Sequence, residues 1–198
     1  MAFATTRGLV LASSSSYRRA LLERLALEYS VCPAAIDETP QPGETPSATA
    51  RRLAAEKARA VTPRFSNHLI IGSDQVATID GVTTLGKPLT HANAVAQLTS
   101  LSGKRAFFYT AVCLLNSATG VLHEAMVPTE VLFRPLSAET VENYLRRERP
   151  YDCTGSAKIE GLGISLVSKV VSEDPSALIG LPLIALCELL ATEGVYVI

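Results

Sequence analysis

The segment HLIIGSDQVATID, residues 68–80, gives the strongest strand signal in the chain. Its apolar residues are followed by the turn pair Asp80-Gly81, so a buried strand within a sheet is expected here. Asp74 stands inside this strand although aspartate is depleted in strands, and Gly72 permits a close backbone approach or a bulge. The carboxylate is either a structural hydrogen-bond acceptor or a group that binds Mg²⁺ or orients an attacking water.

Strand and helix patterns alternate along the rest of the chain. Further strands are expected over 9–12 and 28–37, a hairpin over 105–136 around the turn NSATG, and a glycine-punctuated β segment over 155–171. Helices are expected over 17–27, over 48–61 with Ser47 as cap, over 91–101 after Thr90, over 138–148 after Ser137, and over 182–194. This interleaving predicts an α/β fold with a mixed β-sheet and flanking helices, in a single domain over residues 1–198.

The composition excludes several classes of function. Of the 198 residues, 47% are hydrophobic and 19% are charged, as in globular proteins, and the net charge of −1 provides no basic field for a nucleic acid. The four cysteines form no CxxC pair and the three histidines have no zinc-binding spacing, which favours buried free thiols in a reducing cytoplasm. The N-terminus has too short an apolar stretch for a signal peptide, and no 18-residue apolar run follows, so neither export nor a membrane span is expected.

Two arginines follow four serines where a helix is expected to begin, in the stretch ASSSSYRR. The free N–H groups and partial positive charge of a helix N-terminus ordinarily favour Asp or Glu, so Arg18 and Arg19 have the wrong sign for this position. A bound phosphate would explain them, because serine hydroxyls, N–H groups and a guanidinium could converge on it. The structural alternative is a serine cap followed by two solvated arginines.

A lysine lies on the apolar face of the helix expected over 48–61. Lys57 must either extend to solvent or pair with an anion, since an unpaired buried ammonium is costly. Further charges stand in the loops GKPLT and IDETP. Together the chain offers cations for phosphate oxygens and carboxylates for a metal, which suits phosphoryl chemistry: Arg18, Lys57 and Lys87 with Asp74 and Glu38. No P-loop, dinucleotide-binding glycine motif or nucleophile triad competes with this interpretation.

The stretches that carry these residues occur in an order that resembles the Maf family of nucleotide pyrophosphatases. They are LASSSSYRRALLERL, IDETP, RLAAEKA, IIGSDQV, GKPLT, YTAV and GLPLIAL. The resemblance implies a two-lobed fold with a central cleft, like that of the inosine triphosphatases, and hydrolysis of a nucleoside triphosphate to the monophosphate and pyrophosphate with Mg²⁺ or Mn²⁺. It implies Asp74 as the proton acceptor, Glu38 and Asp74 as metal contacts, and as phosphate contacts Ser13, Ser15, Arg18, Lys57 and Lys87.

Three positions resemble the branch of the family that acts on 7-methyl-GTP: Tyr17, Gln75 and Glu160. The positive charge of the methylated base favours stacking on an aromatic ring, and Glu160 could accept hydrogen bonds from the guanine N1–H and amine. The structural alternatives are that Tyr17 packs on its helix and that Glu160 is solvated. The chain departs from the family pattern at Ser16, where the family has proline, and at Tyr17, where this branch usually has tryptophan; the first change should loosen the phosphate loop.

Two other functions remain alternatives. One is a pyrophosphatase of the sister branch that acts on dTTP and UTP, and the other is a nucleotide-binding regulator of septum formation that has no turnover. Intact Asp74, Lys57 and Lys87 argue against the second. The resemblance also implies a possible homodimer, although no sequence feature points to one.

Overall fold

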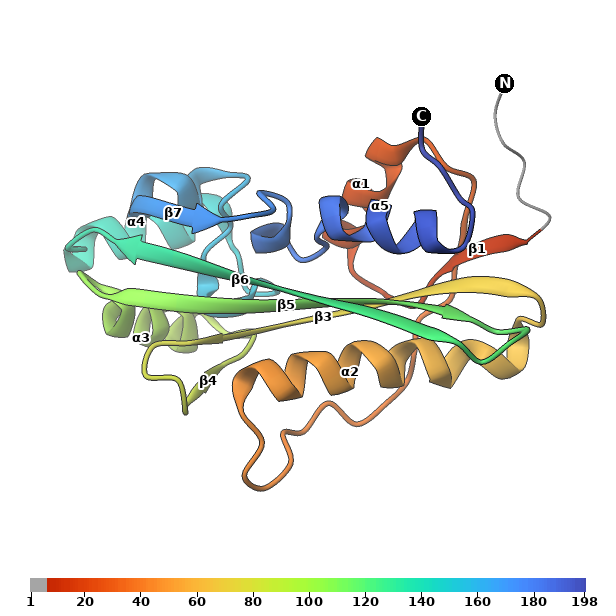
Figure 1. Ribbon diagram of the computed structural model, residues 1–198. Coiled ribbons are helices and arrows are strands. Elements are labelled where there is room, and N and C mark those ends of the chain that lie inside the picture. Colours follow the sequence, from red (N-terminus) through yellow and green to blue (C-terminus); the bar gives the residue numbers. More distant parts are fainter. Residues whose placement is uncertain (1–6) are drawn as a thin grey trace.

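The computed structural model describes residues 7–198 and contains one seven-stranded sheet with helices on both faces (Figure 1). The strands are β1 Gly8–Leu11, β2 Ser30–Val31, β3 His68–Thr78, β4 Thr84–Leu85, β5 Arg105–Asn116, β6 Leu122–Phe133 and β7 Val167–Ser172. Their order is β2-β1-β3-β5-β6-β7, and β4 pairs with β3 outside this path. β1 runs parallel to β2 and β3, whereas β3, β5, β6 and β7 pair in antiparallel fashion. The expected mixed sheet is therefore confirmed.

Helices cover this sheet on both sides. They are α1 Ser16–Leu22, α2 Pro46–Val61, α3 His91–Leu101, α4 Ala138–Glu148 and α5 Leu183–Thr192. In Figure 1, α1 and α5 lie above the sheet and α2 lies below it. Along β3, Leu69 and Ile71 pack in the cluster that contains α1 and α5, while Ile70 between them packs in the cluster that contains α2. A strand covered on both faces is apolar at successive positions, which explains the strong strand signal.

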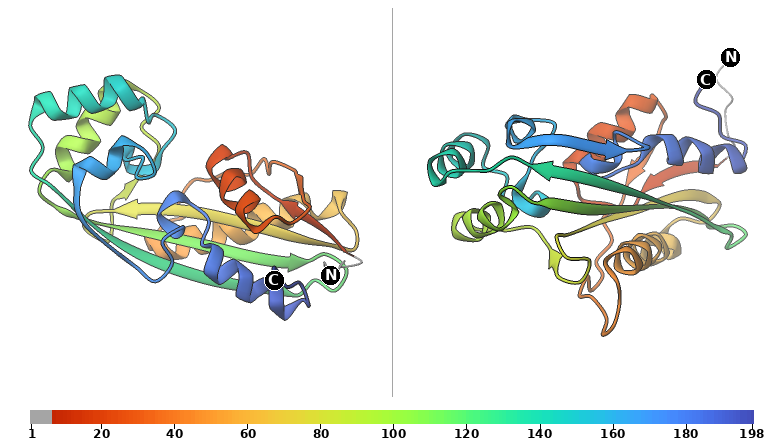
Figure 2. Two further views of the ribbon diagram at one scale, coloured as in Figure 1. Left: turned by 90° about the horizontal axis from the view of Figure 1, so that it is seen from above. Right: turned by 60° about the vertical axis from the view of Figure 1, so that its left-hand side comes forward.

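The long strands β3, β5 and β6 extend through two lobes (Figures 1 and 2). At one end they are covered by α1, α5 and α2. At the other end a separate hydrophobic cluster joins α3, α4 and β7 to the sheet, and it includes Phe108 and Phe133. Ile71 of β3 belongs to the first end and Ala77 to the second. The middle of β3, with Asp74, therefore lies at the boundary between the lobes.

The structure corrects two predicted elements in the first third of the chain. The strand expected over 28–37 forms only β2, a two-residue strand at the edge of the sheet. The cap of α2 is Thr45, whose hydroxyl accepts a hydrogen bond from the Ala48 N–H, rather than Ser47. The helix begins earlier because Pro46 has the backbone angle of a first helical residue and needs no N–H partner there.

Two predicted elements are also too long. The first helix ends at Leu22 and continues as a 3-10 turn over Glu23–Leu25. Residues 155–166 contain two 3-10 turns, so the predicted β segment is correct only from Val167 onward. The local glycines explain this: Gly155 has φ +68°, a left-handed conformation that interrupts a strand.

Two expectations from composition can be compared with the described residues. No helix within residues 7–198 is long and apolar enough to cross a membrane. Residues 1–6, part of the stretch on which the expected absence of an export signal rests, lie outside the described residues. All four cysteines are free, but only Cys32 and Cys113 are buried, so the expectation of buried thiols is wrong for Cys153 and Cys187, which are partly exposed.

Candidate active site

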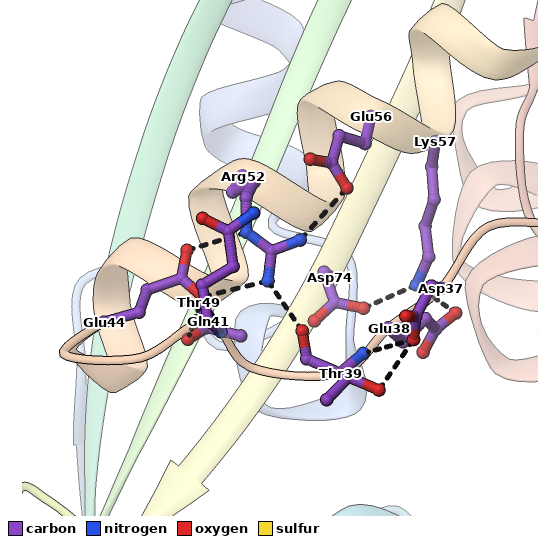
Figure 3. Close-up of polar contacts among 10 residues, drawn as sticks. All are labelled: Asp37, Glu38, Thr39, Gln41, Glu44, Thr49, Arg52, Glu56, Lys57 and Asp74. Atoms are coloured by element: carbon purple, nitrogen blue, oxygen red, sulfur yellow. Dashed lines mark hydrogen bonds and ion pairs between the residues drawn. The ribbon is translucent and has the colours of Figure 1, made fainter.

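An ion-pair cluster with a buried lysine and a buried aspartate lies at the middle of β3 (Figure 3). The Nζ atom of Lys57 in α2 lies 2.6 Å from Asp74 Oδ1 and 2.9 Å from Glu38 Oε1. Lys57 and Asp74 are both 6% exposed, whereas Glu38 lies on the exposed loop before α2. Of the two expected alternatives for Lys57 on an apolar helix face, the structure shows the ion pair: the ammonium contacts two carboxylates and does not extend to solvent.

The short distance between α2 and β3 depends on Gly72. A Cβ atom at this position would overlap the Ala54 carbonyl oxygen and lie 2.9 Å from Cys113 Sγ. Only glycine lets the helix backbone approach the strand this closely. Since Lys57 is one turn beyond Ala54 in α2, and Asp74 is two residues beyond Gly72 in β3, this approach brings the ammonium and the carboxylate together.

The loop that carries Glu38 is held by Arg52 of α2 (Figure 3). Arg52 donates from Nη2 to the Thr39 carbonyl at 3.1 Å and from Nε to Glu44 Oε1 at 2.7 Å. The hydrogen bonds from Arg52 lower the pKa of Glu44 to about 2. Burial alone would raise the pKa of Glu38, but the hydrogen bond and charge of Lys57, with further cations nearby, hold it below its usual range. The loop thus presents Glu38 as a carboxylate.

The serine-rich segment and α1 supply a cationic end to the site. Ser15 caps α1 by accepting from the Arg18 N–H at 3.3 Å, and Ser13 Oγ accepts from the Ser15 N–H at 3.1 Å. Arg18 donates from Nε to the Gly180 carbonyl at 2.8 Å, so its guanidinium is fixed rather than solvated. Burial lowers the pKa of Arg18, while the carboxylates of the cluster oppose this effect. Arg19, in contrast, is exposed.

Two adjoining cavities of about 380 Å³ and about 170 Å³ open along this cluster. They share several lining residues: Ser14, Ser15, Arg18, Gln75, Lys87 and Thr154. The larger cavity contains the ion-pair cluster and the smaller one contains Tyr17 and Glu160. All ten residues that the sequence analysis selected line one cavity or both: Ser13, Ser15, Tyr17, Arg18, Glu38, Lys57, Asp74, Gln75, Lys87 and Glu160. Their proximity is a property of the fold, and their roles remain predictions.

The smaller cavity also contains residues that the sequence analysis missed. The Tyr17 hydroxyl donates to Asp152 Oδ1 at 3.1 Å, and Cys153 Sγ lies 3.4 Å from the same hydroxyl. Burial is the largest cause that raises the pKa of Tyr17, so the phenol is neutral. Lys158 Nζ lies 5.8 Å from the centre of the Tyr17 ring. No sequence signal marks Asp152 or Cys153, because they lie in a loop far from Tyr17 along the chain.

Gln75 is held by backbone carbonyls rather than exposed to solvent. Its Nε2 donates to the carbonyls of Ala177 and Leu178, each at 3.0 Å, and to Thr110 Oγ1 at the same distance. Glu160 is exposed at the edge of the smaller cavity. The Gln75 side chain therefore has a fixed orientation, whereas the exposed Glu160 side chain is able to change its rotamer.

The carboxylates present fit a metal ion that is shared with a substrate. No group of three or more His, Cys, Asp or Glu that could hold a metal occurs within residues 7–198. Glu38 and Asp74 supply two carboxylates joined by Lys57. Mg²⁺ prefers hard oxygen ligands and is commonly bound by one or two carboxylates together with substrate phosphates. This donor set fits such a shared site better than a preformed metal cage.

Comparison with known sequences decides the family. The sequence model described as "Maf-like protein" matches residues 8–193. The chain belongs to the Maf family. The resemblance found in the ordered motifs is thereby confirmed, and the match covers both lobes and every residue of the candidate site.

Several curated proteins are similar to this Maf protein over nearly their whole length. The 7-methyl-GTP pyrophosphatase of Nitrosospira multiformis is 55% identical over 190 residues, which cover 96% of each chain. The 7-methyl-GTP pyrophosphatase of Methylobacillus flagellatus is also 55% identical, over 96% of this chain and 98% of its own. Among solved structures, a nucleoside-triphosphatase (dITP/XTP pyrophosphatase) from Mycobacterium abscessus matches 65% of this chain and 75% of its own, with a TM-score of 0.44 and 16% identity.

Proposed function

We propose that this Maf protein hydrolyses 7-methyl-GTP to the nucleoside monophosphate and pyrophosphate, removing a modified nucleotide from the cell. One observation carries the proposal: a buried carboxylate, Asp74, faces a cavity that has fixed cations on one side and an aromatic, acidic pocket on the other. That arrangement suits a triphosphate joined to a cationic base. The relatives named 7-methyl-GTP pyrophosphatase support the same substrate.

In the proposed reaction Asp74 is the general base. Its Oδ1 is held by Lys57 at 2.6 Å, and its Oδ2 accepts no hydrogen bond from residues 7–198, so this oxygen is available to a water in the cavity. Asp74 Oδ2 accepts a proton from that water while the water oxygen attacks the α-phosphorus. The bond between this phosphorus and the bridging oxygen breaks, and pyrophosphate leaves with the bonding electrons. Lys57 keeps the carboxylate in one orientation throughout.

The cations stabilise the charge of the triphosphate. Arg18 has its Nε fixed by a backbone carbonyl at 2.8 Å, and its Nη1 donates to Ser13 Oγ at 3.5 Å; its remaining N–H groups can donate to phosphate oxygens. Lys87 is exposed on the loop between β4 and α3, lines both cavities and forms no ion pair within residues 7–198, so it can reach the phosphates. Ser13 and Ser15 place their hydroxyl groups at the N-terminus of α1, where they can donate to phosphate oxygens. Glu38 and Asp74 would hold Mg²⁺ or Mn²⁺ together with phosphate oxygens, and such an ion would supply charge neutralisation at the triphosphate.

The base is recognised in the smaller cavity. The ring of Tyr17 offers a face for the positively charged methylated base, an interaction worth about 0.5 to 2 kcal/mol. Glu160 accepts hydrogen bonds from the N1–H and amine of guanine, donors that thymine and uracil do not present in that arrangement. Gln75, held by the carbonyls of Ala177 and Leu178, closes the cavity at the sheet.

A substrate panel tests this function. Purified protein with Mg²⁺ is given 7-methyl-GTP, GTP, dTTP and UTP in parallel, and pyrophosphate release is measured. We expect the highest kcat/KM for 7-methyl-GTP; a preference for dTTP or UTP would instead support the sister branch. Asp74→Asn should lower kcat by a factor of at least 100, as expected for loss of a general base. Glu139→Gln removes an exposed carboxylate from α4 and should leave kcat unchanged.

A regulator without turnover is the alternative from another class. It requires nucleotide binding that Asp74→Asn leaves intact and pyrophosphate release that is absent from the wild-type protein. Homodimer formation and a cytoplasmic location complete the proposal, and sedimentation of the purified protein and fractionation of cells test them.

A further inference from the structure

One loop contacts both the phosphate side and the base side of the site. Residues 174–184, which we call the 174–184 loop, comprise most of the connection between β7 and α5 and the first two residues of α5, and they contain a 3-10 turn over Ala177–Ile179. The Gly180 carbonyl accepts from Arg18 Nε at 2.8 Å. The carbonyls of Ala177 and Leu178 accept from Gln75 Nε2, each at 3.0 Å. Backbone oxygens of this loop thus orient one residue on each side of the proposed substrate.

Two buried hydroxyls attach the same loop to the centre of the sheet. Ser73 Oγ donates to the Gly180 carbonyl at 3.0 Å, and Thr110 Oγ1 donates to the Ala177 carbonyl at 2.9 Å. Gly180 has φ +122°, a conformation that other residues rarely adopt. The position of the Gly180 oxygen is therefore defined by the loop conformation, and any change in that conformation moves the acceptor that holds Arg18.

A single carboxylate joins the two ends of the 174–184 loop. Asp174 is 2% exposed. Its Oδ1 accepts from the Ser176 N–H at 3.0 Å and from Ser176 Oγ at 2.6 Å. Its Oδ2 accepts hydrogen bonds from the N–H groups of Ile184 at 2.7 Å and Ala185 at 3.3 Å. The Asp174 carboxylate thus caps the first turn of α5. Ser176 Oγ in turn accepts from the Leu183 N–H at 2.7 Å, which closes the loop further.

We propose that Asp174 is a positioning residue for the proposed reaction: it fixes the 174–184 loop so that the Gly180 carbonyl directs the Arg18 guanidinium toward the triphosphate. The inference rests on the proposed function, because it assigns Arg18 to the phosphates. Asp174 lines neither cavity, so it acts through the loop and not by contact with substrate. Asparagine at this position would keep the shape but place an NH₂ group against N–H donors, which would open the loop.

The test is a double-mutant cycle on binding of inorganic triphosphate in the presence of Mg²⁺, measured by titration calorimetry. We expect Asp174→Asn to weaken binding about tenfold in the wild-type background, within the range for residues of one hydrogen-bond network. In an Arg18→Lys background the same change should weaken binding less than twofold, since lysine has no Nε–H for the Gly180 carbonyl to orient. Equal factors in the two backgrounds, or no effect in either, would overturn the proposal.

A matched control separates positioning from general loss of stability. Ser137→Ala removes the hydroxyl that caps α4 in the other lobe, so it should lower the melting temperature without changing the affinity for triphosphate. If Asp174→Asn does not fold, Ser176→Ala breaks the same loop closure with the carboxylate retained, and its cycle with Arg18→Lys decides the question. Wild-type protein that binds triphosphate but releases no pyrophosphate from 7-methyl-GTP would refute the proposed function alone. Failure of the wild-type protein to bind triphosphate would refute this inference as well.

Discussion

The contact between Gly72 and α2 gives a prediction that can be worked from distances. In Gly72→Ala the added Cβ would lie 3.1 Å from the Ala54 carbonyl carbon and 2.9 Å from Cys113 Sγ, and it would overlap the Ala54 carbonyl oxygen. Carbon atoms in good contact are roughly 3.5 to 4.0 Å apart, so α2 must move away from β3 by about 1 Å. Overpacking of this kind costs about 1 to 3 kcal/mol of folding free energy.

The same movement should reduce activity beyond the loss of stability. Lys57 is one turn from Ala54, so α2 would carry its ammonium away from Asp74, which it now contacts at 2.6 Å. A misplacement of about 1 Å in a catalytic site can lower the rate by roughly 100-fold. We therefore expect Gly72→Ala to lower both the free energy of unfolding, measured in urea, and kcat/KM for 7-methyl-GTP, measured where the variant is fully folded.

Gly86→Ala serves as the stability control, because a Cβ there meets no atom of residues 7–198 within 4 Å and the backbone does not need a positive φ. The free energy of unfolding of Gly86→Ala should differ from that of the wild-type protein by less than about 1 kcal/mol. We expect a small increase, because alanine restricts the unfolded chain more than glycine does. Gly72→Ala with the stability and kcat/KM of the wild-type protein would refute the argument that this glycine brings α2 and β3 together.

Three further predictions follow from the titratable groups. Lys57→Met should lower the free energy of unfolding by about 3 to 5 kcal/mol in a urea titration, because it leaves the buried Asp74 carboxylate unpaired. The pKa of Glu38 is below its ordinary value of 4.5, so its contribution to stability should be complete above pH 4.5 and lost as pH falls through the lower pKa of the folded protein. The difference in unfolding free energy between wild-type protein and Glu38→Gln measures this, and a difference that grows as pH falls would contradict it. Burial raises the pKa of Cys153 to about 12, so its alkylation at pH 7 should be far slower in folded than in urea-unfolded protein, followed by mass spectrometry.

Conflicts between a residue and its local pattern were the most useful sequence signals. A carboxylate inside an apolar strand and an ammonium on an apolar helix face each break a local rule, and proteins tolerate such breaks mainly at functional sites. The structure pairs these two residues, Asp74 and Lys57, directly with each other. Arg18, a cation at a helix start, is explained in part by the Gly180 carbonyl that holds its Nε.

Errors in the predicted elements have local causes. Residues 28–37 have a strand pattern, but only Ser30 and Val31 pair with β1, because this segment forms an edge of the sheet. Residues 155–166 are rich in glycine, which is compatible with a strand and with tight turns, and Gly155 adopts a conformation that only the turns allow. Pattern alone cannot separate such cases, since the decision lies in the partners that the backbone finds.

The fold class, the family motifs and the chemical types present in the site could be predicted from the sequence, since periodicity and misplaced charges are local properties. Which groups meet depends on how the chain folds. In the folded chain, Arg52 donates a hydrogen bond to the loop that carries Glu38, and the Tyr17 hydroxyl donates one to Asp152. The fold also brings the carbonyls of the 174–184 loop to Gln75 and Arg18. Backbone oxygens have no sequence signature, because every residue carries one, so their role appears only when the chain is folded.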